Sequence, residues 1–365
     1  MRRYDIHGIV DVIIGSNVVP EVIKEIDFQI GAFLVEGKAD SIEGRPTIHI
    51  RPYADSAVHD PSEGLGDAVF YHNRGSVGAF VRDPGEKLFV SRTETGFVIC
   101  ADYSNFLINL YIQLLLSDMG MTMTHAAAFE AKDGRVTLLA GAGGIGKTAV
   151  LGYAVAELGL RHLGDDIVIV DESGNCHAFP RQFVLKSYHK EIYSEVFEKK
   201  RLPKWNAYGL KRFIIENAPF VGFMKKFLKQ RGIYYRVANV LRPQQFLASV
   251  SPDEVFGDGT MAERGKIGRV IYLDRCFQPE FSSSSIQPDV LVNRLFSVIH
   301  YEWKDFMTHL LTLGSLNVID LPKYLKNNLS IFSSVIADSE ITQINIPEDA
   351  SPGRLIEYLE KEGVL

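Results

Sequence analysis

Short apolar runs separated by turn-forming residues fill the first hundred positions of the chain. The runs are strand-like in length, and segments such as Asp83-Pro84-Gly85 between them favour tight turns. This pattern predicts a β-rich N-terminal domain, residues 1–101, built on an antiparallel sheet. The runs occupy residues 9–14, 47–50, 68–71, 88–90 and 96–99.

A different pattern begins at Asp102. Residues 105–116 are apolar on almost every side, which predicts a largely buried helix capped by Asp102 or Ser104. Two strand-like runs follow, residues 124–130 and 136–140, and the glycine turn between them predicts a β-hairpin. Helical and strand-like segments then continue to the end of the chain, so the fold class we expect is α/β with α+β character and a mixed sheet.

The second domain is expected to span residues 102–365 and to carry one large insertion. Residues 187–242 have a helical and basic pattern, which predicts a helical cap. A solvated surface explains that pattern, and so does a cap that recognises an anionic substrate; the sequence leaves both open. Further strands are predicted at residues 167–171, 176–186, 246–250 and 266–275.

A C-terminal α/β segment is predicted over residues 286–365. The serine-rich residues 281–285 in front of it have the composition of a flexible connector. The segment itself should contain a long amphipathic helix, a strand and a final helix. These elements are expected at residues 288–313, 341–346 and 352–362.

Composition narrows the classes of function. With 365 residues, of which 46% are hydrophobic, the chain can bury a large core. Its net charge of −6 gives no overall attraction for nucleic acid or an anionic membrane, and the most apolar run, residues 106–116, is too short to span a bilayer. The three cysteines lack paired spacing, which fits a reducing compartment. We expect a cytoplasmic protein with neither nucleic-acid nor membrane partners; a homo-oligomer stays open.

One stretch after the run at 136–140 satisfies every fixed position of the phosphate-binding P-loop. Glycines in such a loop let backbone N–H groups turn toward phosphate oxygens, and the positive end of the following helix adds its field. Lys147 would reach the β- and γ-phosphates of ATP, and the Thr148 hydroxyl would hold Mg²⁺. The loop consists of Gly141, Ala142, Gly143, Gly144, Ile145, Gly146, Lys147 and Thr148.

Two adjacent carboxylates, Asp165 and Asp166, lie between the helical pattern after the loop and a strongly β-branched strand. In a P-loop enzyme a carboxylate from a neighbouring strand has to reach the magnesium ion. Burying two such groups side by side is costly without a cation, so their pairing favours a metal site. An exposed acidic turn is the other explanation.

With Thr124-His125-Ala126-Ala127 before the loop and Gly164-Asp165-Asp166 after it, the central part resembles the HPr kinase/phosphorylase branch of the P-loop kinases. The ATP-dependent phosphoenolpyruvate carboxykinases are the structural relatives of that branch. The pieces Phe179-Pro180-Arg181 and Val184-Leu185-Lys186 are also similar to kinase homologues. The resemblance covers residues 120 to about 190, and it implies a P-loop kinase fold that uses ATP and Mg²⁺.

The resemblance also implies roles for single residues. Asp166 would orient or deprotonate a hydroxyl acceptor, and Asp165 would bind the metal together with Thr148. Lys147 would offset the charge of the transferring group, and His125 would touch the γ-phosphate or the acceptor, although a hydrogen-bonded core histidine explains His125 equally well. Further candidates for phosphate or substrate contacts are Arg181, Arg264 and Arg269.

The expected function is therefore Mg²⁺-dependent transfer of the γ-phosphate of ATP to a hydroxyl of a peptide, a protein or a small molecule. The alternative is a regulatory P-loop ATPase without a dedicated acceptor; a decarboxylating carboxykinase and a mechanical ATPase are less favoured. HPr kinases carry a Glu-x-Arg-Gly-x-Gly segment, whereas Glu263-Arg264-Gly265-Lys266-Ile267-Gly268 has glutamate and arginine adjacent. The resemblance therefore does not extend to HPr as the acceptor or to phosphorylase activity.

Overall fold

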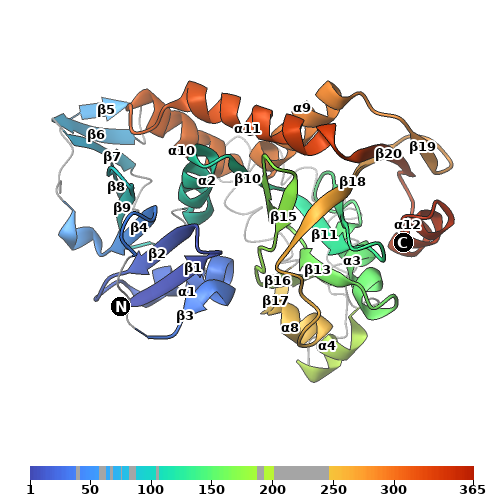
Figure 1. Ribbon diagram of the computed structural model, residues 1–365. Helices are drawn as coiled ribbons and strands as arrows, with labels where there is room; N and C mark the ends of the chain where they lie inside the picture. Colours follow the sequence, from blue (N-terminus) through green and yellow to red (C-terminus); the bar gives the residue numbers. More distant parts are fainter. Residues whose placement is uncertain are drawn as a thin grey trace, which may run out of the picture. The chain divides into compact units, whose positions relative to one another are not determined.

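The computed structural model describes residues 1–37, 42–56, 63–65, 69–74, 76–81, 88–103, 107–186, 193–200 and 246–365. Contacts divide the chain into a large unit, residues 1–181 with 258–365, and a small unit, residues 182–257. The large unit is of the mixed α/β class with two mixed sheets (Figure 1). The predicted domain boundary near residue 101 stays a prediction.

The first sheet has the strand order β3-β1-β2-β4-β9-β8-β7-β6-β5. Its strands are β1 Arg2–Ile6, β2 Val10–Ile14, β3 Leu34–Val35, β4 Thr47–Arg51, β5 Glu63–Leu65, β6 Val69–Arg74, β7 Ser76–Val81, β8 Leu88–Arg92 and β9 Gly96–Ala101. The β-rich character is confirmed, but the prediction of an antiparallel sheet is wrong, because β2 pairs with β4, and β4 with β9, in parallel.

Helix α1, Pro20–Ile30, makes the parallel pairing feasible. Parallel neighbours need a long crossover between them, usually a helix, and α1 lies in the connection from β2 to β4. Its buried residues Val22, Ile26 and Ile30 are spaced four positions apart, which places them on one face of the helix. Two short 3-10 turns, Gly31–Phe33 and Tyr53–Asp55, complete this part.

The second sheet has the order β10-β14-β15-β18-β12-β11-β13, with β20 beside β18 and β19 beside β20. Its strands are β10 Met121–Thr124, β11 Ala126–Glu130, β12 Val136–Ala140, β13 Arg161–Gly164, β14 Val168–Asp171, β15 Asn175–His177, β18 Arg264–Cys276, β19 Ser282–Ser284 and β20 Glu340–Pro347. The predicted hairpin of β11 and β12 is confirmed. Parallel pairing of β12, β18 and β20 directs their C-terminal ends to one edge, where open α/β sheets bind ligands.

Six helices of the large unit follow the first sheet in the described ranges: α2 Ile108–Asp118, α3 Lys147–Ala156, α9 Pro288–Glu302, α10 Lys304–Ser315, α11 Leu321–Ala337 and α12 Pro352–Lys361. Residues of α9 and α11, including Leu291, Leu295, Phe332 and Val335, share a core with the second sheet. These two helices run beside each other in Figure 1, coloured orange and red. None of the helices in the described ranges has both the length and the apolar character needed to cross a bilayer.

Several predicted elements need correction. Helix α2 starts with Leu107 in a left-handed conformation and without a side-chain cap; Asp102 instead accepts a hydrogen bond from the Tyr53 N–H, and Ser104, the other predicted cap, lies outside the described residues. The predicted strand 176–186 is interrupted, and the predicted helix 288–313 is divided at Trp303 into α9 and α10. Helix α11 was not predicted.

The serine-rich segment 281–285 is not a connector. Ser282–Ser284 form strand β19, which pairs antiparallel with β20. The side-chain amide of Asn345 donates to the hydroxyl of Ser282, so the serines take part in the sheet edge. The predicted strand at 341–346 and the final helix are confirmed as β20 and α12.

The small unit contains β16 Phe183–Lys186, β17 Phe246–Val250, α4 Ser194–Lys199 and α8 Pro252–Phe256. Strands β16 and β17 pair antiparallel, and Ser251 caps α8 in a capping box with Glu254. Most of the predicted helical cap, residues 187–242, lies outside the described residues.

Candidate phosphate site

The P-loop connects the end of β12 to the start of α3, as the strand, loop and helix pattern predicts. Gly141, Gly144 and Gly146 have φ values of +145°, +77° and +114°, which residues with a side chain rarely adopt. A Cβ added to Gly141 would lie 2.5 Å from the carbonyl oxygen of Leu273 in β18. The glycines therefore give the loop its path and let it approach the neighbouring strand.

Lys147, the first residue of α3, is buried and holds the loop together from inside. Its ammonium donates to the carbonyl oxygens of Gly141 at 2.7 Å and Ala142 at 3.0 Å. The same nitrogen lies 3.1 Å from Nε2 of His125. A positive charge thus lies at the N-terminal end of α3, whose dipole also favours anions.

His125 connects the loop lysine to the acidic pair. It lies at a bend between β10, which pairs with β14, and β11, which pairs with β12 and β13. An ammonium can only donate, so Nε2 of His125 is the acceptor and the neutral ring carries its proton on Nδ1. That Nδ1 lies 3.3 Å from Oδ1 of Asp166. Burial, followed by the charge of Lys147, lowers the pKa of His125, which agrees with a neutral ring.

Asp165 follows strand β13 and lies next to Thr148. The hydroxyl of Thr148 donates to Oδ2 of Asp165 at 2.9 Å, whereas Oδ1 is buried and has no hydrogen-bond partner in the described part of the chain. Burial raises the pKa of Asp165 to about 7, and the neighbouring Asp166 adds to the rise. A hydroxyl beside a carboxylate with one buried, unpartnered oxygen fits a small hard cation such as Mg²⁺.

Asp166 lies between His125 and Arg181. One guanidinium nitrogen of Arg181 donates to Oδ2 of Asp166 at 2.8 Å, and the guanidinium lies over the ring of Phe28 at 4.9 Å from its centroid. Arg181 thus holds one oxygen of this carboxylate by a hydrogen bond, and Nδ1 of His125 lies 3.3 Å from the other. Four of the expected catalytic, metal and substrate residues, His125, Asp165, Asp166 and Arg181, lie together beside the loop.

Arg264 and Arg269 lie elsewhere on β18. Arg264, at the start of the strand, lies 3.5 Å from Asp171 and is more than half exposed. Arg269 donates to Glu340 and to the carbonyl of Gly363. It pairs in register with Thr137, three positions before the end of β12 at which the loop begins. The structure does not bring these two arginines to the loop.

One residue at the loop was missed by the sequence reasoning. Oε1 of Glu302 accepts a hydrogen bond from the Gly143 N–H at 2.8 Å. Glu302 is the last residue of α9, far from the loop along the chain, and no motif surrounds it. A carboxylate therefore lies where the P-loop pattern predicts phosphate oxygens.

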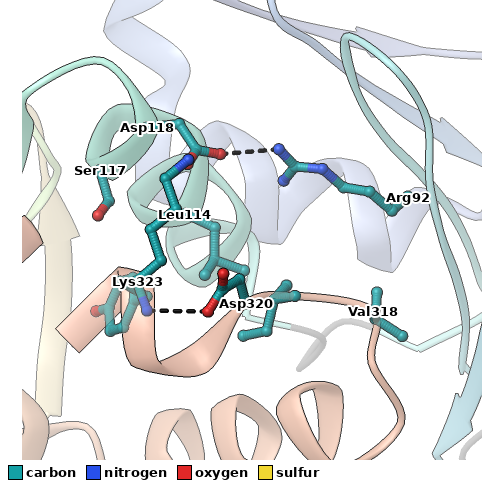
Figure 2. Close-up of a pocket in the computed structure, with 9 residues that line it drawn as sticks. Arg92, Leu114, Ser117, Asp118, Val318, Asp320 and Lys323 are labelled. Carbon is teal, nitrogen blue, oxygen red and sulfur yellow. Dashed lines mark hydrogen bonds and ion pairs between the residues drawn. The ribbon is translucent and has the colours of Figure 1, made fainter. Parts of the chain in front are cut away.

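A separate cavity of about 180 Å³ lies between α2, β8 and the start of α11 (Figure 2). Asp118 on its wall bridges Arg92 at 2.9 Å and Lys323 at 2.7 Å, and Asp320 caps α11 through the Lys323 N–H. Arg92, Asp118 and Lys323 on this wall are therefore paired with each other. Within the described ranges, no three His, Cys, Asp or Glu side chains cluster in a way that could hold a metal ion.

No protein-family model matches the chain, and no curated protein matches it significantly.

Proposed function

We propose that the protein is an ATP- and Mg²⁺-dependent kinase of the HPr kinase/phosphorylase-like type that phosphorylates a hydroxyl group. The observation that carries the proposal is the convergence at one loop of Lys147, His125 and the acidic pair. A phosphotransferase needs a cation for the donor phosphates, a metal ligand and a group that orients the acceptor. These residues supply all three within one connected set.

The residues at the loop divide into a donor side and an acceptor side. On the donor side, the loop amides and Lys147 would bind the triphosphate, and Thr148 with Asp165 would hold Mg²⁺, which when bound neutralises charge on the phosphates. On the acceptor side, Asp166 would accept a hydrogen bond from the hydroxyl to be phosphorylated. An aspartate in this position acts mainly by orienting an alcohol whose proton leaves late.

His125 and Arg181 support the acceptor side. Arg181 directs the carboxylate of Asp166 by its hydrogen bond before an acceptor binds, and His125 lies beside the other oxygen of that carboxylate. His125 also contacts Lys147, which couples the position of the base to the donor site. The acceptor itself is a serine of a peptide or protein, or a small-molecule alcohol.

Labelled ATP tests the proposal. The protein is incubated with γ-labelled ATP, Mg²⁺ and a panel of serine peptides, proteins and small alcohols, and we expect label on an acceptor. Lys147→Ala should abolish transfer and weaken triphosphate binding, whereas Asp166→Asn should keep binding but lose about 10²- to 10⁴-fold in turnover. Label found only as free phosphate would favour the alternative, a regulatory ATPase, and a near-normal rate of Asp166→Asn would exclude Asp166 as the base.

A further inference from the structure

The carboxylate of Glu302 lies against the phosphate loop as a bound anion would. Oε1 accepts from the Gly143 N–H at 2.8 Å, and a Cβ built on Gly143 would lie 3.0 Å from Oε2. Both oxygens are therefore close to the loop backbone. Backbone N–H groups of this kind of loop are the donors that bind phosphate oxygens.

The position of Glu302 on its own helix does not explain this contact. Glu302 ends α9, and a negative charge at the C-terminal end of a helix is unfavourable. The compensating attraction comes from the loop, where the N-terminal end of α3 and the ammonium of Lys147 are positive. Glu302 is thus held at the loop by the same forces that would hold a phosphate group.

We propose that Glu302 is a built-in competitor of the nucleotide: its carboxylate occupies part of the phosphate site, and a bound phosphate chain has to expel it. This inference rests on the proposed function, because it requires that the loop bind phosphates. The Gly143 N–H cannot serve two anions at once, and a carboxylate beside a triphosphate is repelled by it. Nucleotide affinity is therefore lower than the loop alone would give.

Expulsion of Glu302 has a consequence for the helix junction next to it. Trp303 follows Glu302 directly, separates α9 from α10 and packs beside Phe306, with ring centroids 5.1 Å apart. Departure of the Glu302 carboxylate from the loop moves a negative charge on the residue next to Trp303. The surroundings of Trp303 therefore report whether the carboxylate is at the loop.

Pyrophosphate binding tests the competition directly. Affinity is measured by calorimetry for the wild type, for Glu302→Gln, which keeps the size but removes the charge, and for Glu94→Gln. Glu94 is exposed in the turn between β8 and β9 of the first sheet, so its replacement makes the same change in net charge on the sheet that does not carry the loop. We expect Glu302→Gln to bind pyrophosphate and ATP about tenfold more tightly, the equivalent of a charge-assisted hydrogen bond, and Glu94→Gln to match the wild type.

Tryptophan fluorescence provides a second readout. The chain has two tryptophans, so Trp205→Phe leaves Trp303 as the single reporter. Pyrophosphate should change the emission of this variant. When Glu302→Gln is added to it, the emission without ligand should move toward that of the ligand-bound form, and the response to pyrophosphate should shrink.

The outcomes separate the inference from the proposed function. Equal or weaker pyrophosphate binding by Glu302→Gln overturns the competition and leaves the kinase proposal standing. Tighter binding without phosphate transfer to any hydroxyl supports the competition and counts against the kinase. If none of these proteins binds pyrophosphate more tightly than Lys147→Ala, which is the reference for a damaged site, both the competition and the kinase proposal are overturned.

Discussion

Asp165 is expected to destabilise the protein when no cation is bound. The carboxyl group of Asp165 has a pKa of 3.8 in an unfolded chain, whereas burial and the adjacent Asp166 raise its pKa to about 7 in the fold. The folded state therefore binds this proton more tightly than the unfolded chain. The contribution of protonated Asp165 to the free energy of unfolding is fully present below pH 3.8. It declines as pH rises toward 7 and is lost above that pH. Asp165→Asn lacks the ionisation and should escape this loss.

The size of the effect follows from the two pKa values. At about 1.36 kcal/mol per pKa unit, a rise from 3.8 to about 7 corresponds to an upper value of about 4 kcal/mol at pH 8. Asp165 as a residue is partly exposed although its Oδ1 is buried, so water reduces the penalty, and we expect about 2 kcal/mol. For a protein of 365 residues the asparagine variant should melt about 3 °C higher.

Thermal melting in EDTA between pH 5.5 and 8.5 measures this difference. At pH 5.5 the gain from Asp165→Asn should be smaller than its value at pH 8. Added Mg²⁺ and nucleotide should then stabilise the wild type more than the variant, because the carboxylate can bind the cation. A variant that melts at or below the wild-type temperature at pH 8 in EDTA would refute the reasoning.

Asp171→Asn is the matched control. Burial opposes ionisation of Asp171, but hydrogen bonds from Asn175 and contact with His177 outweigh it and hold the pKa of Asp171 below its usual value. The ionised form of this group therefore stabilises the fold above its usual pKa. Its replacement should lower the melting temperature at pH 8, opposite in sign to Asp165→Asn.

Two further predictions concern the loop and the core. Gly141→Ala places a Cβ 2.5 Å from the carbonyl oxygen of Leu273 in β18 and should abolish pyrophosphate binding. A Cβ on Gly144 meets open space, so Gly144→Ala should lower the free energy of unfolding by only about 1 kcal/mol. Asn328→Leu removes the buried oxygen that accepts from both the Gln113 amide and the Thr122 hydroxyl, and it should cost about 2 to 4 kcal/mol, measured by denaturant unfolding. Asn327→Leu, at a less buried site on the same helix, should cost clearly less, and equal losses would contradict the assignment.

Elements with a strong local signal could be predicted from the sequence. The hairpin around Gly134, strand β20 and helix α12 have turn residues, alternation or caps within their own segments. The parallel pairing of β4 with its neighbours could not be predicted in this way, because it depends on which distant strands meet. Helix α1 did carry a signal, the spacing of its buried residues, and its crossover would have pointed to the parallel arrangement.

The candidate site shows the same division between local and distant information. The P-loop and the acidic pair could be found because their chemistry restricts residue type at fixed spacing. His125 and Arg181 could be proposed only through a family resemblance, and their shared contact with Asp166 depends on how β10, β13 and the segment after β15 come together. Glu302 had no signal at all, since a glutamate at the end of a helix looks like any other surface residue. Its contact with Gly143 joins segments 159 residues apart, so this group, which would control access of phosphate to the loop, is visible only in the folded chain.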